Sequence, residues 1–162
     1  MTDRYFILFY NCLFCYMRYY SEREILELRD EADLYDLDGR EELHSLPLES
    51  IIMVYNGIGP SSFPSWLRKV ITFVYSSLAV CALIHDLDYY CGTTKDEWIK
   101  ANERFRDNGY KVAERKYGKW NPMRYVTKTN SWLFYKCVCT NTGWNAFNSK
   151  VESVEDRCIG FD

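Results

Sequence analysis

The sequence is poor in histidine and has no large excess of charge of either sign. Two of its 162 residues are histidines, and the formal net charge is -3. A balance this close to neutral gives no global indication of a nucleic-acid partner. No internal repeat or low-complexity tract is visible. The composition is 48% hydrophobic and 17% aromatic, which argues against disorder and predicts a single folded domain over residues 1–162.

The charges that are present are distributed unevenly. Residues 21–50 hold eleven acidic and three basic side chains, whereas residues 92–157 hold thirteen basic and eight acidic ones. The simpler interpretation of both segments is solvated helix faces. The alternative is that the basic half meets an anionic surface, such as a layer of phospholipid headgroups.

The chain has seven cysteines, an odd number that excludes complete pairing within one molecule. Cys81 lies in an apolar run and is predicted to be a small buried residue. Cys12 and Cys15 could form a four-thiolate zinc site with Cys137 and Cys139. That site is less favoured, because the second spacing is tight and no histidine is near. Reduced structural thiols are the preferred interpretation, and they fit synthesis in a bacterial cytoplasm.

The N-terminal residues Tyr5 to Met17 are uncharged and rich in aromatic side chains. This run is too short to span a bilayer comfortably. It also lacks a basic n-region and a small-residue cleavage site, so no signal peptide is predicted. A buried strand or helix is the preferred interpretation, and a segment that touches a membrane is the alternative.

The first half of the chain contains one clear helix signal. Ser21 and Glu24 have the spacing of a capping box and open a helix predicted from Glu22 to about Tyr35. The Asp-Gly within 36–40 indicates a turn. Residues 48–55 carry β-branched and apolar side chains and predict a short strand or an extended lead-in.

The centre of the chain contains its longest apolar stretch. A loop rich in glycine, proline and serine at 56–64 precedes it. Residues 70–84 are uncharged, and fifteen such residues favour a buried core helix over a membrane span. Ser76 and Ser77 are the expected place for a break, and Gly92 is expected to end the helix.

A second helix is predicted from Lys95 to about Tyr117, with Thr94 as its cap. Its inward face is predicted from the spacing of Trp98, Ala101, Asn102 and Phe105. A short connection makes the two helices antiparallel neighbours. Residues 120–161 show little pattern and predict irregular or short β/α packing. The expected fold class is therefore mainly α, with irregular N- and C-terminal additions around this helix pair.

The chemistry of the centre rests on His85 and Asp86, which are adjacent on a helix and diverge by about 100°. Tyr89 lies one turn further and can reach either of them. Asn102 is polar on an otherwise apolar face. If it is buried it needs a hydrogen-bond partner, and His85 is the natural candidate. Such a pair fixes the imidazole tautomer and leaves the other nitrogen to take a proton from water.

The loop at 56–64, which precedes the long apolar stretch, is predicted to bind a cation. Gly57 and Gly59 can adopt angles that turn several carbonyls inward. Carbonyls together with one carboxylate, here Asp86, are ligands that Ca²⁺ prefers. The ion would polarise an ester carbonyl and stabilise the developing oxyanion. Two alternatives stay open, namely a phosphate site at the helix N-terminus and a motif that arose by chance.

These residues resemble the phospholipase A2 superfamily. Its secreted and parvoviral members carry a Tyr-x-Gly-x-Gly calcium loop, and Tyr55-Asn56-Gly57-Ile58-Gly59 has that pattern. The catalytic helix of the family carries His-Asp-x-x-Tyr, matched by His85, Asp86 and Tyr89. The stretch is also similar to phospholipase A2-like proteins of gut bacteria, their phages and mobile elements, which carry Asn-Gly-x-Gly-Pro, a helix with Cys before His-Asp, and Ala-Asp-x-x-Phe. This chain has Asn56 to Pro60, Val80 to Asp86, and Ala101 to Phe105.

The resemblance implies Ca²⁺-dependent hydrolysis of a phospholipid acyl ester at a membrane surface. It implies that His85 is the general base and that Tyr89 supports it by hydrogen bonding. The ion would be held by Asp86 and by the main-chain carbonyls of Tyr55, Gly57 and Gly59. In a phage or mobile-element setting, such an enzyme would breach or remodel a membrane. The protein itself could be associated with a virion or a membrane.

The chain departs from the family pattern at one position of the site. The aspartate that orients the histidine is replaced by Asn102, which accepts a hydrogen bond but brings no charge to stabilise an imidazolium. The family's disulfide framework is also absent, and the loop lies further from the histidine than in the secreted enzymes. The resemblance covers residues 56–108, within a core expected at about 51–117.

Two further interpretations of function stay open beside the enzyme. Asn102 favours a catalytically inactive relative that binds lipid or a protein, such as a structural component of a virion. The other is a cytosolic interaction domain in which the motif is fortuitous.

Overall fold

The computed structural model describes residues 20–59 and 64–158 and shows a mainly helical protein, with no strand among them. The aromatic run from Tyr5 to Met17 lies outside the described residues, so its prediction stays open. The elements are α2 (Glu22–Leu34), α3 (Arg40–Ser45), α4 (Leu48–Val54), α5 (Ser65–Val74), the 3-10 helix η1 (Ser76–Leu78), α6 (Ala79–Cys91), α7 (Lys95–Lys116), α8 (Pro122–Val138) and α9 (Asn141–Cys158).

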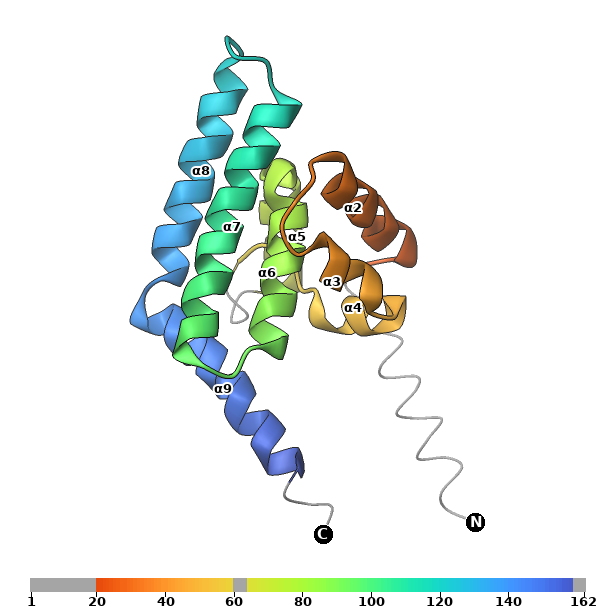
Figure 1. Cartoon of the computed structure of the whole chain (residues 1–162), viewed down its shortest axis with the longest axis vertical. Helices are drawn as coiled ribbons and strands as arrows, with labels where there is room; N and C mark the ends of the chain where they lie inside the picture. The colour runs from red at the N-terminus through yellow and green to blue at the C-terminus, as the bar shows by residue number, and fades with distance from the viewer. Residues whose placement is uncertain (1–19, 60–63, 159–162) are drawn as a thin grey trace.

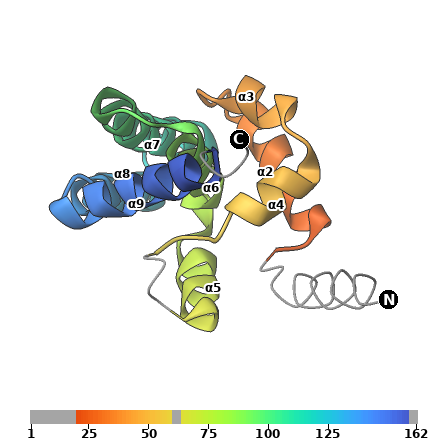
Figure 2. The ribbon, with the colours of Figure 1, turned by 90° about the horizontal axis from the view of Figure 1, so that it is seen from below.

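Helix α6 lies at the centre of the molecule (Figure 1). Nine of its thirteen residues are buried. The long helices α7 and α8 lie side by side on one flank, and α2, α3 and α4 lie on the other (Figure 1, Figure 2). A helix enclosed by neighbours on both flanks must be apolar nearly all round, which explains the long run without charge. Cys81 is fully buried in this core, as predicted.

Helix α2 confirms the helix predicted from the capping box. The Ser21 side chain accepts from the backbone N–H of Glu24, and the Glu24 carboxylate accepts from the backbone N–H of Ser21 at 2.7 Å. The turn predicted after it is also present, with Asp36 at φ 46° and Gly39 at φ 93°. This left-handed geometry favours glycine at the second position, and α3 begins immediately afterwards.

The strand or extended segment predicted at 48–55 is wrong, because Leu48–Val54 forms helix α4. Its β-branched residues Ile51 and Ile52 are buried in the core. Pro47 immediately precedes the helix, and Glu49 in the first turn favours the positive end of the helix dipole. Packing against α2 and α6 therefore outweighs the modest strand preference of these side chains.

The break predicted at Ser76 and Ser77 is confirmed. The apolar stretch is divided into α5, η1 and α6, and the chain bends by 89° between the segments Leu67–Val74 and Ser76–Cys91. None of the helices in the described part of the chain is by itself long and apolar enough to cross a membrane. The bent pair passes that test by length and composition only.

Gly92 follows the last residue of α6, as predicted, but not through a left-handed turn. Its φ is -79°, which any residue adopts. A Cβ at this position would lie 2.8 Å from the ring of Phe147 and 2.9 Å from the Asp88 carbonyl oxygen. Close packing against α9 therefore explains why glycine is needed here.

The helix predicted from Lys95 is confirmed as α7, with Thr94 and Glu97 forming its capping box. The four residues predicted to face inward are all buried. The irregular structure predicted for 120–161 is wrong over 122–158, which forms α8 and α9. The start signal was present in the sequence, since the Asn121 side chain caps α8 and Pro122 takes the first helical position.

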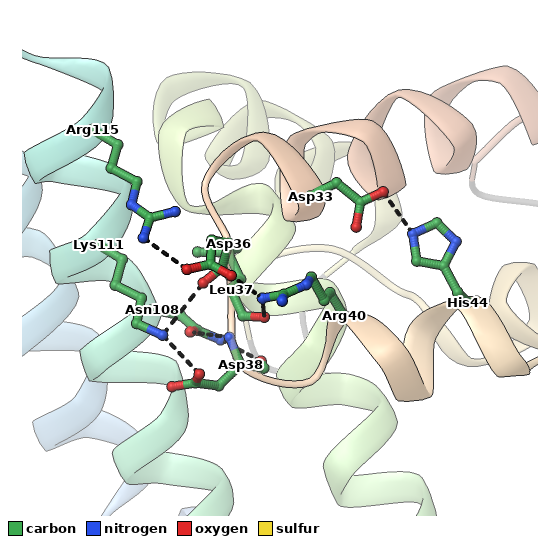
Figure 3. Close-up of polar contacts among 9 residues, drawn as sticks. All are labelled: Asp33, Asp36, Leu37, Asp38, Arg40, His44, Asn108, Lys111 and Arg115. Carbon is green, nitrogen blue, oxygen red and sulfur yellow. Dashed lines mark hydrogen bonds and ion pairs between the residues drawn. The ribbon is translucent and has the colours of Figure 1, made fainter.

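The acidic turn between α2 and α3 is attached to the basic helix α7 (Figure 3). The buried amide of Asn108 accepts from the backbone N–H of Asp38 at 2.9 Å and donates to the Asp38 carbonyl at 2.8 Å. Lys111 pairs with the Asp38 carboxylate, and Arg115 pairs with Asp36. Part of the acidic charge of the first half of the chain is therefore paired with basic side chains of the second half. Those charges are not simply solvated, and they do not all face a partner.

Replacing Glu97 by Gln should reduce the free energy of unfolding at neutral pH. Hydrogen bonds from the backbone N–H groups of Thr93 and Thr94 and from the Thr94 hydroxyl lower the pKa of the Glu97 carboxyl to about 2. Because this pKa lies below the ordinary value of 4.5, its contribution is complete above that value and is lost as the pH falls towards 2. Urea unfolding from about pH 7 to about pH 3 measures the difference.

Glu103→Gln is the matched control, because Glu103 is exposed in the middle of the same helix. The change in the free energy of unfolding caused by Glu103→Gln should not vary with pH as the Glu97 carboxyl titrates. Equal pH dependence in the two variants would contradict the assignment to Glu97.

Candidate active site

His85 projects from the centre of α6 towards α7. The residue is 9% exposed, and its Nε2 lies 3.0 Å from Oδ1 of Asn102. The contact joins residues 17 positions apart, across the connection between the two helices. The structure thus brings together the pair expected from the sequence.

Tyr89 belongs to the same hydrogen-bonding group. Its hydroxyl donates to Asn102 Oδ1 at 2.8 Å and accepts from Nε1 of Trp98 at 2.9 Å. The ring of Tyr89 also lies 4.1 Å from the imidazole of His85, centroid to centroid. Trp98 was expected only as an apolar contact. Its indole N–H, which needs an acceptor when buried, was the available signal.

The direction of these bonds fixes the protonation of the imidazole. The Trp98 N–H can only donate, so the Tyr89 hydroxyl accepts from it and gives its own proton to Asn102. Burial raises the pKa of Tyr89, which keeps that proton in place. The Asn102 oxygen then accepts from both neighbours, which assigns the proton of neutral His85 to Nε2 and the lone pair to Nδ1.

The amide nitrogen of Asn102 is left without a hydrogen-bond partner. Asn102 is fully buried, and its Nδ2 has no acceptor among the described residues. An unsatisfied buried donor costs about 1–3 kcal/mol. A carboxylate at this position would make the same two contacts through oxygen and bring no orphaned donor, so the local geometry suits aspartate at least as well as asparagine.

The glycine loop lies beside the carboxylate of Asp86. Gly57 has φ 85° and Gly59 has φ 122°, both in the left-handed region expected for them. The backbone N–H of Asn56 donates to Oδ2 of Asp86 at 3.2 Å, a contact between residues 30 positions apart. Tyr55, at the start of the loop, is 1% exposed, and its hydroxyl lies 3.4 Å from the Ala79 carbonyl oxygen.

Three further residues, not singled out from the sequence, hold the loop in place. The hydroxyl of Thr72 on α5 accepts from the backbone N–H of Ile58 at 2.8 Å and from the Tyr20 hydroxyl at 3.3 Å. Arg68 donates to the side-chain oxygen of Asn56 at 2.7 Å. Arg68 and Thr72 lie one turn apart on α5 and are both buried. Polar residues at that spacing within an apolar helix were the available signal.

The residues present fit a hard cation through one carboxylate, Asp86, together with main-chain oxygens. Among residues 20–59 and 64–158, no three His, Cys, Asp or Glu side chains gather in a metal-binding arrangement. One carboxylate, Asp86, lies against a loop whose two left-handed glycines redirect its carbonyls, which is chemistry that Ca²⁺ accepts. Cys137 and Cys139 are exposed free thiols, and the other half of the alternative zinc site lies outside the described residues.

A second polar group lies one turn from His85, on the side of α6 that faces α3. Asp88 pairs with Arg104 at 2.8 Å, and burial raises the pKa of Asp88 to about 6 despite this partner. The two residues border a cavity of about 180 Å³ that is also lined by Cys91, Gly92, Glu97, Lys100 and Ala101. His85 does not line it, so this cavity is separate from the His85 group.

Replacing Gly57 by Ala should destabilise the protein by about 1–3 kcal/mol, the usual cost of strained backbone. An added Cβ would overlap the Tyr20 hydroxyl and lie 2.8 Å from Oγ1 of Thr72, at a φ that L residues rarely adopt. Thermal unfolding measures the change. Gly118→Ala is the control, because nothing lies within 4 Å of its Cβ position. Equal stability of the two variants would contradict the loop geometry.

Comparison of the chain with protein-family models, with curated proteins and with solved structures finds no match in any of the three.

Proposed function

We propose that the protein is a phospholipase A2-like hydrolase that uses Ca²⁺ to cleave a phospholipid acyl ester. The observation that carries the proposal is the hydrogen bond between His85 and Asn102. It brings the His-Asp-x-x-Tyr motif of α6 into contact with the inward asparagine of α7 in one buried group. The contact between the Asn56 N–H and Asp86, the neighbour of His85, brings the glycine loop beside α6. The family pattern described above pairs the histidine with the residue at position 102 and places the loop next to Asp86.

His85 would act as the base towards water. Asn102 holds the ring through Nε2, so Nδ1 is the atom that takes the proton when the water oxygen attacks the ester carbonyl. Tyr89 and Trp98 keep Asn102 oriented through their own hydrogen bonds. The base is thus held by groups that have no freedom to rotate away.

The loop and Asp86 would hold the ion. The ligands are the Asp86 carboxylate and the main-chain oxygens of Tyr55, Gly57 and Gly59, and a bound Ca²⁺ supplies positive charge for the developing oxyanion. Arg68 is already a positive charge beside Asn56. It lowers the loop's attraction for a second cation, so we expect binding weaker than that of a site with several carboxylates.

Helix α5 offers a surface suited to a lipid substrate. It follows the glycine loop and exposes Phe73 at 83%, Val74 at 65% and Val70 at 51%. Exposed apolar residues gathered on one short helix are characteristic of sites that meet a membrane or another apolar partner. Their nearness in sequence to the loop is what links them to the proposed chemistry.

The second candidate function is binding without turnover, and Asn102 favours it. Asparagine brings no negative charge to stabilise the imidazolium that forms when His85 takes a proton. A protein with this residue could therefore bind Ca²⁺ and lipid without hydrolysing the ester, as a virion component would.

Replacing His85 by Ala should lower Ca²⁺-dependent release of fatty acid about 10²–10⁴-fold, because the general base is lost. The assay uses mixed phosphatidylglycerol and phosphatidylcholine vesicles, with Ca²⁺ or with a chelator. The other histidine provides the control. His44→Ala removes an exposed side chain that contacts Asp33 on the α2–α3 side of the molecule, and it should retain activity.

The outcomes separate the candidates. Turnover that needs both Ca²⁺ and His85 supports the enzyme. Ca²⁺ binding by calorimetry without turnover supports the inactive relative. If the protein neither binds Ca²⁺ nor hydrolyses the lipid, the fortuitous motif is the remaining interpretation.

Replacing Asn102 by Asp should preserve or raise activity. The carboxylate keeps both accepted hydrogen bonds, removes the orphaned amide donor and stabilises the imidazolium. It also raises the pKa of His85, so the acid limb of the pH–rate profile should move to higher pH. The measurement is kcat across the pH range for both proteins.

Asn108→Asp is the matched control, because Asn108 is also a fully buried asparagine on α7. Its amide donates to the Asp38 carbonyl, so a carboxylate there should destabilise the fold. A large loss of activity in a folded Asn102→Asp protein would show that this position is wrongly assigned.

A further inference from the structure

Helix α8 carries most of its large apolar side chains on the solvent side, while Phe134 packs against the core. Its buried residues are Thr127 and Ser131. The exposed large side chains of the helix are Met123, Tyr125, Val126, Trp132 and Leu133. Trp120, just before the helix, is 87% exposed. A surface helix in a globular protein normally has the opposite arrangement.

The packing of α8 on α7 explains this orientation. A Cβ on Gly109 of α7 would lie 2.6 Å from the Ser131 Cβ, so the two helices approach through small residues. The Ser131 hydroxyl donates to the Arg106 carbonyl at 3.0 Å and is satisfied there. A larger residue at this contact would separate the helices, so most of the bulky residues of α8 are left on the outside.

The outward residues lie within a segment that has no acidic side chain. From residue 115 to residue 151 the sequence contains no aspartate or glutamate, and it contains seven basic residues, namely Arg115, Lys116, Lys119, Arg124, Lys128, Lys136 and Lys150. Three of these are paired, Arg115 with Asp36 and both Arg124 and Lys128 with Glu114 of α7. Lys119, just before α8, and Lys136, near its end, are left to place positive charge beside the apolar face.

Two lysines lie over the exposed indole rings. Lys119 Nζ is 5.6 Å from the ring centroid of Trp120, and Lys136 Nζ is 5.5 Å from that of Trp132. Neither lysine pairs with a carboxylate within the described part of the chain. Tryptophan and lysine side by side occur where a protein meets the headgroup layer, since the ring enters the interface and the ammonium group contacts phosphate.

We propose that the outer face of α8, formed by Tyr125, Val126, Trp132, Leu133 and Lys136, docks on a bilayer that contains anionic phospholipid, together with the exposed Trp120 in the turn before the helix. The rings and aliphatic side chains enter the boundary between headgroups and acyl chains. Lys119 and Lys136 contact lipid phosphate. This surface deepens the proposed function, on which it rests for the identity of the substrate, by naming a second surface, besides α5, through which the protein contacts the membrane.

The chemistry of the face favours a bilayer over other partners. A second copy of the chain would bring its own basic segment against this one, and the two would repel. A nucleic acid would match the lysines and indoles but would offer little to Val126 and Leu133. An anionic bilayer satisfies the lysines, the indoles and the aliphatic residues together.

The test is co-sedimentation of the full chain with vesicles in the presence of chelator, so that no turnover occurs. Binding should be strong to vesicles of phosphatidylglycerol with phosphatidylcholine and weak to phosphatidylcholine alone. Trp120→Ser with Trp132→Ser, and separately Lys119→Glu with Lys136→Glu, should each lower binding at least about tenfold. These side chains are exposed, so the variants should fold, which thermal unfolding checks.

Matched controls lie away from α8. Leu34→Ser with Met53→Ser removes two apolar side chains that are each 68% exposed on α2 and α4. Lys95→Glu with Lys100→Glu makes the same change of charge at the exposed start of α7. Both control pairs should bind vesicles like the native protein.

Three results would overturn the proposal. One is no vesicle binding, or binding that the α8 variants and the controls lower equally. The second is a concentration-dependent dimer that the α8 variants abolish. The third is tighter binding to single-stranded nucleic acid than to vesicles. His85→Ala should dock normally, so loss of docking and loss of catalysis are distinguishable.

Discussion

The rest of the structure depends on a single carbonyl oxygen, Oδ1 of Asn102. It accepts hydrogen bonds from His85 and from Tyr89, and it ties α6 to α7 at the centre of the molecule. Both donors come from α6, in which nine of thirteen residues are buried and an unpaired polar group is costly. The need to satisfy these groups sets the register of the two helices and, with it, the orientation of the imidazole. The position of the proposed base is therefore a consequence of packing.

The glycine loop is linked to this centre through Asp86, the neighbour of His85. Successive residues of a helix point in different directions, so one faces α7 while the next meets the backbone of Asn56. Thr72 and Arg68 on α5 complete the support of the loop. The proposed chemistry thus rests on three helices and one loop, all within residues 55–116. The α2–α3 turn is held separately by Asn108 and by the cations of α7, and it adds stability without entering the site.

Local signals predicted local structure well. The capping box at Ser21, the helix cap at Thr94, the break at Ser76 and the inward face of α7 all depend on neighbours within a few residues, and all are confirmed. The prediction failed where packing outweighs propensity. Ile51 and Ile52 favour a strand in isolation but are buried on a short helix. In α8 Tyr125 and Trp132 face solvent, so the usual inward apolar pattern did not reveal a helix there.

The sequence by itself determined which groups could carry the chemistry: one histidine beside an aspartate, a loop with two spaced glycines, and an asparagine at an inward position. It also determined the acid-free segment that contains α8. The tertiary structure alone decided which of these groups meet. The contacts from His85 to Asn102, from Asp86 to Asn56 and from Thr72 to Ile58 join residues 14 to 30 positions apart. Only it decided that α8 turns Trp132 outward, because the small residues Gly109 and Ser131 allow the two helices to approach on the other side.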